Sequence, residues 1–154
     1  MSKFADDSFI QRIVTQYSGM ITRIAFQHTR NAADAEDIMQ DVFFSLLKQP
    51  PFETEQYLKH WLIRVTINKS KNYLRATRNR NTVPLNRDYA LSQEQDEVFN
   101  ELQKLPEKEH NILYLFYYEG YTAKEIADIL GKKESAIFMR LNRAREKLKK
   151  FLEE

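Results

Sequence analysis

Acidic side chains that could hold a metal ion or move protons gather in one stretch, Asp34-Ala-Glu-Asp-Ile-Met-Gln-Asp41. Metal or acid–base catalysis needs carboxylates or imidazoles that converge on one point. These acids instead fall at the start of an expected helix, whose dipole favours negative charge there. The chain has no cysteine, and its three histidines are isolated (His28, His60 and His110). The sequence therefore predicts no catalytic residue, metal site, cofactor or small-molecule substrate, and a small helical nuclease is the least favoured function.

Cations and amides form a second group of chemically capable residues. Residues 57–87 contain eight Lys and Arg and no Asp or Glu, whereas a solvated helix face usually mixes both signs. Cations meet phosphates, and side-chain amides can pair with base edges. This block therefore favours contact with nucleic acid. The residues expected to make that contact are Arg64, Asn68, Lys69, Asn72 and Arg75.

The stretch from Gly120 to Arg145 has the pattern of a helix-turn-helix. Thr122 and Glu125 can form a capping box, and Gly131 stands where a first helix must end and turn. A second helix opens near residue 134 or 135, and its buried stripe is expected at Ile137, Leu141, Ala144 and Leu148. This pattern predicts that the second helix enters the DNA major groove. A helical hairpin that only packs a core is the alternative.

The DNA-facing side of that second helix follows from its inward stripe, because successive residues rotate by about 100° around a helix. The expected contacts on this helix are Ser135, Phe138, Met139, Arg140, Asn142 and Arg143. Thr122, at the start of the first helix, is also expected to contact DNA. Phe138 and Met139 are suited to thymine methyl groups. They are equally suited to packing against an inhibitor or against the other domain.

The elements that must position these residues are all expected to be helices, since Gly and Pro are few and apolar residues recur at helical spacing. Expected helices begin near residues 7–9, 33, 55, 95 and 107, before the helix-turn-helix. The second should bury Ala35, Ile38, Val42 and Leu46, and the third Leu58, Trp61, Leu62 and Val65. The predicted fold is all-α: two small helical domains, residues 1–78 and 97–154, joined by a flexible linker, residues 79–96.

Targeting signals are not recognised in the sequence. The N-terminus lacks a basic segment followed by an apolar run, and no apolar run approaches the roughly 18 residues of a membrane helix. Because neither signal is recognised, we expect a cytoplasmic protein. The net charge is +2.

Three motifs, in order, resemble a bacterial RNA polymerase sigma factor of the sigma-70 family, extracytoplasmic-function (ECF) type. Residues 34–43 are similar to the family's region 2.2 signature, and residues 61–74 to its regions 2.3 and 2.4. The third motif runs from Leu102 to Leu152 and is similar to region 4. His110 departs from the usual Arg, and Phe138-Met139 stand where Lys or Arg followed by Ser is common.

The resemblance implies a transcription initiation factor with several partners. The residues implied to bind the β′ clamp helices of core RNA polymerase are Asp37, Gln40, Asp41 and Phe44. Region 4 would bind the β flap and the promoter −35 element, while Asn68 and its helix would capture the melted −10 element. The loop at about residues 49–54 corresponds to the family's specificity loop. An anti-sigma factor, often membrane-anchored, is also implied.

A stand-alone helix-turn-helix regulator is the alternative function, with the N-terminal half as an effector or dimerisation domain. Such a regulator would bind specific duplex DNA by itself, whereas a sigma factor needs polymerase. The acid-free block favours the sigma factor, because an effector domain has no need of it.

Overall fold

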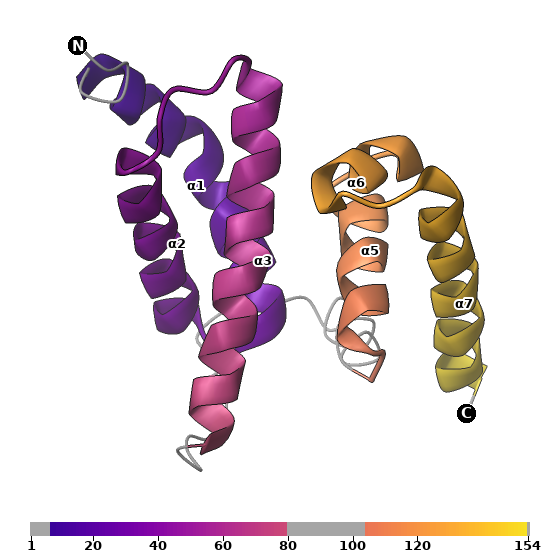
Figure 1. Ribbon diagram of the computed structural model, residues 1–154. Helices are drawn as coiled ribbons and strands as arrows, with labels where there is room; N and C mark the ends of the chain where they lie inside the picture. The colour runs from indigo at the N-terminus through magenta and orange to yellow at the C-terminus, as the bar shows by residue number, and fades with distance from the viewer. Residues whose placement is uncertain (1–6, 80–103, 154) are drawn as a thin grey trace. The chain divides into compact units, whose positions relative to one another are not determined.

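The computed structural model describes residues 7–79 and 104–153, which form six helices and contain no strand (Figure 1). Their contacts divide them into two compact units. The first contains α1 (Asp7–Thr29), α2 (Ala32–Leu47) and α3 (Glu55–Asn79); the second contains α5 (Glu107–Tyr117), α6 (Ala123–Leu130) and α7 (Glu134–Glu153). The expected all-α, two-domain fold is confirmed. The helix expected near residues 95–105 and nearly all of the expected linker lie outside the described residues.

Helix α1 is the centre of the first unit, since both α2 and α3 pack against it and also against each other. Helix α2 buries the four residues expected of it. In α1, Phe9, Ile10 and Val14 are half-buried, and the apolar residues that are fully buried at helical spacing are Ile13, Tyr17, Met20, Ile21, Ile24 and Ala25. The largest fully buried side chains of this unit are Ile13, Ile21, Ile24, Leu46, Leu62 and Ile63.

A two-residue joint sets the position of α2. Arg30 adopts a left-handed backbone conformation, with φ of +53°, and Asn31 is extended. The Asn31 side-chain oxygen accepts a hydrogen bond from the Asp34 backbone N–H at 3.0 Å. Asn31 therefore caps α2 by satisfying one of the backbone donors that the first turn leaves unpaired.

Helix α3 buries a wider face than the sequence pattern predicted. Ile63, Ile67, Thr66 and Ser70 are buried, whereas Trp61 and Val65 of the expected stripe are only half-buried. The hydroxyls of Thr66 and Ser70 donate to the carbonyls of residues four positions earlier, at 2.6 and 2.7 Å. These polar residues can therefore be buried without partners from other helices. The face is wide because α3 packs against two helices at once.

The second unit contains the predicted helix-turn-helix. Thr122 Oγ1 accepts from the Glu125 backbone N–H, and Glu125 Oε1 accepts from the Thr122 backbone N–H, both at 3.1 Å. Gly131 ends α6 in the left-handed conformation, with φ of +65°. Both the predicted capping box and the predicted turn are thus confirmed. The core of this unit includes Leu113, Leu115, Ile126, Ile129 and Ile137.

The stripe predicted on α7 is buried at Ile137, Leu141 and Ala144, while Leu148 is half-buried. His110, which replaces a more usual Arg in the motif, lies buried in α5. Within the described ranges, no helix is long and apolar enough to cross a membrane.

Candidate polymerase and nucleic-acid interfaces

The outer face of α2 carries all four residues predicted to bind polymerase. Asp37, Gln40, Asp41 and Phe44 are exposed, opposite the buried stripe of the same helix. The Phe44 side chain is 63% exposed, the highest value among the large apolar side chains of the described residues. These positions share one helix face because Gln40 and Asp41 are each three or four residues from both Asp37 and Phe44.

An apolar groove of about 300 Å³ adjoins that face, and Phe44 is part of it. Residues from α1 form its other wall, which the sequence pattern did not reveal because it does not show how two helices are paired. The groove is lined by Ile10, Val14, Met39, Gln40, Phe43, Phe44, Leu46 and Leu47. Exposed Phe44 is therefore continuous with an apolar surface, in addition to standing beside two acids.

Asp34, the first acid of the region 2.2 motif, has a structural contact. The Tyr73 hydroxyl of α3 donates a hydrogen bond to Asp34 Oδ2. This bond joins the first turn of α2 to α3, so the helix with the acidic face and the helix with the basic face are directly connected. No group of His, Asp and Glu side chains within the described residues could hold a metal ion.

The basic face of α3 holds the residues predicted to contact the −10 element. Arg64, Asn68, Asn72 and Arg75 are exposed and separated by four, four and three residues, so they follow one side of the helix. Lys69 is half-buried beside this row. The structure thus places the five predicted residues along one helix, with no acidic side chain between residues 57 and 76 of the helix.

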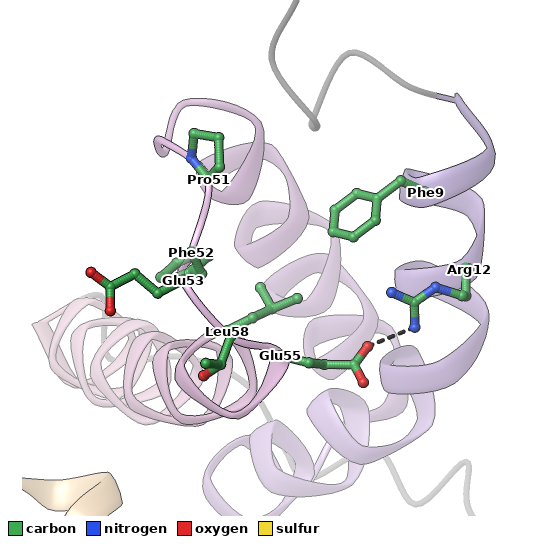
Figure 2. A pocket seen from close by; sticks show the side chains of 8 residues that line it. Phe9, Arg12, Pro51, Phe52, Glu53, Glu55 and Leu58 are labelled. Carbon is green, nitrogen blue, oxygen red and sulfur yellow. Dashed lines mark hydrogen bonds and ion pairs between the residues drawn. The ribbon is translucent and has the colours of Figure 1, made fainter.

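A pocket of about 210 Å³ opens where the loop before α3 meets α1 (Figure 2). Phe9 and Arg12 of α1 form one wall, and the loop contributes the other. Arg12 Nη1 lies 2.6 Å from Glu55 Oε1, and this ion pair links α1 to the first turn of α3. The pocket is lined by Phe9, Arg12, Pro51, Phe52, Glu53, Thr54, Glu55 and Leu58. Sequence reasoning identified the loop but missed the α1 residues.

Trp61 and Tyr17 lie next to the residues that line the pocket. The Phe52 ring packs on Trp61 with centroids 5.7 Å apart, so Trp61 supports the loop while remaining half-buried. Burial raises the pKa of the nearby Tyr17 hydroxyl above its usual value of 10.0; the Glu55 charge raises it further, and the Arg12 charge opposes this.

The outer face of α7 presents both polar and apolar side chains. Phe138 and Met139 are 51% and 56% exposed, and Ser135, Asn142 and Arg143 are also exposed. Arg140 is half-buried at the margin of this face. Thr122 is exposed, and because its side-chain oxygen accepts the capping hydrogen bond, its hydroxyl proton and one lone pair are left for a DNA contact.

Arg145 is the residue of this surface that the sequence reasoning missed. Its Nε donates to the Tyr117 hydroxyl at 2.6 Å, and its guanidinium lies over the rings of Phe116 and Tyr117. Its Nη1 also donates to Asn142 Oδ1 at 3.5 Å. Arg145 therefore connects α5 to α7 and restrains Asn142. A three-residue spacing from Asn142 was its only sequence signal.

Together, the two units define a DNA-binding protein with two separate candidate contact surfaces. One surface is a basic helix beside a small pocket, and the other is the second helix of a helix-turn-helix. Comparison with known proteins identifies the family. Residues 13–80 match the family model "Sigma-70 region 2", and residues 95–148 match "Sigma-70, region 4".

Relatives agree with these matches. The chain is 31% identical to Probable RNA polymerase sigma factor RfaY of Xanthomonas campestris pv. campestris, an alignment that covers 87% of this chain and 38% of RfaY. It is 25% identical to the ECF RNA polymerase sigma factor SigM of Mycobacterium tuberculosis, covering 97% of this chain and 78% of SigM. The fold is similar to that of the sigma factor RpoE from Bartonella quintana, solved with the anti-sigma factor NepR (TM-score 0.73, 21% identity, covering 93% and 96% of the two chains). The chain belongs to the sigma-70 family of RNA polymerase initiation factors, in its ECF branch.

Proposed function

We propose that this chain binds core RNA polymerase and directs it to promoters whose −35 and −10 elements it reads, where it stabilises the melted strand. The observation that carries the proposal is the pairing of a region 2 match and a region 4 match on two helical units in the family's order. The stand-alone regulator is less favoured, because an effector or dimerisation domain does not require a region 2 unit with an acid-free helix face.

The polymerase-binding surface is the exposed face of α2. Asp37 and Asp41 offer charge, Gln40 offers an amide, and Phe44 offers apolar area that binding would remove from water. We assign this face to the β′ clamp helices. The second unit contacts the β flap. The resemblance to sigma region 2.2 is the basis for the first assignment, and the continuous groove beside Phe44 supports it.

The −10 element is captured by α3 and the neighbouring pocket. Cations along α3 hold the phosphates, and Asn68 supports recognition of a base extruded from the stack. Extrusion costs a few kcal/mol, so a site that holds such a base must supply charge and a shaped cavity. The pocket between Phe9, Phe52 and the Arg12–Glu55 pair supports this role, since it lies at the first turn of the same helix.

The −35 element is read by α7. The helix-turn-helix presents the first turns of its second helix to the major groove, and the exposed face of α7 carries the predicted contacts there. We place region 2 in residues 1–78, the linker in residues 79–96 and region 4 in residues 97–154.

The chain itself performs no bond chemistry in this proposal, because polymerase does so. It works in the cytoplasm, where polymerase is found. We also propose that an anti-sigma factor controls it by covering polymerase- and DNA-binding surfaces, on the example of RpoE, whose structure was solved in complex with NepR.

Run-off transcription with purified core enzyme on a genomic library tests the function. We expect initiation from specific promoters only when chain and core are combined, and little promoter binding by the chain alone in a gel shift. Specific duplex binding without polymerase, together with no promoter-dependent transcription, would establish the stand-alone regulator instead.

The polymerase-binding face can be tested separately. Asp37→Ala with Asp41→Ala is expected to weaken binding to core enzyme in a pull-down or titration. Asp128→Ala, which removes an exposed acid from α6, is the control for loss of negative charge alone. Equal core binding by the double variant and the control would remove α2 from the interface.

A further inference from the structure

Phe138 and Met139 form an apolar patch near the start of α7, where the neighbouring exposed side chains are polar. The inward rotation of α7 is fixed by Ile137, Leu141 and Ala144, which are at most 1% exposed. Residues 138 and 139 therefore cannot turn into the core, and about half of each side chain meets solvent. Single exposed apolar residues are common, but two adjacent ones on this part of a recognition helix lie where base edges are read.

The charge around the patch favours DNA as its occupant. Residues 132–143 contain four cations, Lys132, Lys133, Arg140 and Arg143, against one acid, Glu134, a net charge of +3. Cations on both sides of an apolar centre match a groove whose two rims are phosphates. A protein that covered the patch would have to bring an acidic rim of its own.

The chemistry of the major groove then selects the base. Thymine alone among the four bases presents a methyl group there, and apolar side chains contact it. Adenine, guanine and cytosine are read there through hydrogen-bonding groups, and an apolar side chain packed against those groups would bury them without a partner. An apolar patch in this place therefore discriminates in favour of thymine.

We propose that Phe138 and Met139 give this recognition helix its specificity, by reading the C5 methyl groups of two thymines in the −35 element. The inference rests on the proposed −35 function and adds the class of base that is recognised. Asn142 lies four residues after Phe138 and three after Met139, so it shares the same face. Its amide matches adenine, which makes an A·T-rich element the expected site.

Deoxyuridine tests the proposal, because it pairs as thymine does and lacks only the methyl group. The probe is a promoter duplex whose −35 segment has been selected from random sequence by the wild-type holoenzyme. Each −35 thymine is replaced in turn by deoxyuridine, and holoenzyme binding is measured at constant salt. We expect one or two positions where binding weakens roughly fourfold, the ratio for one buried CH₂-sized group.

Variants then assign the residues. Phe138→Ala should remove the deoxyuridine effect at one position and Met139→Ala at the other, and both residues are exposed enough for the fold to be unaffected. Asn142→Ala should weaken binding to every template while keeping the methyl effect. Deoxyuridine effects below twofold at all positions, or effects that persist in both variants, would overturn the proposal.

The outcomes separate this inference from the function on which it rests. A holoenzyme that initiates at specific promoters but ignores thymine methyl groups would overturn the inference alone. A chain that supports no initiation with core enzyme would overturn the proposed function as well. If Phe138→Ala left promoter binding unchanged but abolished binding of a protein inhibitor, the patch would belong to that partner and the thymine proposal would fail.

Discussion

Helices α3 and α7 each bury one stripe and expose one polar face, yet they differ in what they bury and what they expose. Helix α3 buries Thr66 and Ser70 among its apolar residues, and its exposed row carries only cations and amides. Helix α7 buries a narrow apolar stripe and exposes Phe138 and Met139 near its start and Leu152 near its end, among mixed charges.

The difference shows how two DNA-reading surfaces can divide the work. In the function we propose, the basic face of α3 holds phosphates whatever the sequence and the neighbouring pocket supplies the selection, an arrangement that suits a single strand with exposed bases. A mixed face with apolar groups discriminates between base edges only when the helix lies in a duplex groove. Each of the following predictions compares matched changes in the two units.

The largest expected effect concerns the two cores. Ile63 in α3 and Ile126 in α6 are both completely buried. Ile63→Ala and Ile126→Ala should each lower the free energy of unfolding of their own unit by about 2–5 kcal/mol, because each leaves a cavity. Hydrogen exchange followed helix by helix measures this. Equal loss of protection in both units from either change would contradict the existence of two independent cores.

The next effect concerns the two asparagines on the exposed faces. Asn68→Ala should reduce open-complex formation on the order of tenfold with near-normal core binding, if its amide supports a base. Asn142→Ala should instead weaken −35 duplex recognition by a similar factor. Permanganate reactivity of the melted strand reports the first and holoenzyme binding to a −35 duplex the second. Unchanged promoter opening by Asn68→Ala at every promoter tried would remove Asn68 from the −10 site.

The helix caps provide a smaller effect. Asn31→Ala and Thr122→Ala should each cost about 1 kcal/mol, because each leaves a backbone N–H of a first helical turn unpaired. Thermal unfolding monitored by circular dichroism measures the loss. Asn31→Asp and Thr122→Ser keep an accepting oxygen and should restore most of the stability; failure of these replacements would show that capping is not the cause.

The smallest effect compares one ion pair in each unit. Lys147 lies 2.9 Å from Glu109, whose side chain is only 9% exposed, whereas Arg12 and Glu55 are each about half exposed. Lys147→Met should cost on the order of 1 kcal/mol, since it leaves a buried carboxylate unpaired, although solvent reaches the lysine and reduces the value. Arg12→Met should cost less and should matter less at high salt. Urea unfolding at two ionic strengths compares them; a larger loss for Arg12→Met would reverse the ranking.

Local signals predicted much of this fold. The positions of the described helices, the buried face of α2, the capping box at Thr122 and the left-handed turn at Gly131 follow from spacing and from the chemistry of single residues. Such features depend on neighbours within about four residues along the chain, which a sequence displays directly.

Features that depend on the pairing of helices were harder to predict. Three such features depend on contacts between helices that are distant in sequence. They are the burial of Ser70, the contribution of Phe9 to the pocket and the restraint of Arg145 by Tyr117. The burial of Thr66 and Ser70 was not predicted because both residues are polar. Each hydroxyl donates a hydrogen bond within its own helix, which allows the side chain to be buried. The candidate surfaces were therefore predicted as three rows of residues, on α2, α3 and α7, without the groove beside α2 or the pocket before α3.

The joint between α1 and α2 has an evolutionary consequence. Only Arg30 and Asn31 separate the helices, and each adopts a specific backbone conformation. One added residue would either displace the cap or turn α2 by about 100°, which would move its acidic face away from any partner. This joint should therefore accept changes of residue type far more readily than changes of length, whereas the seven residues between α2 and α3 leave room for both.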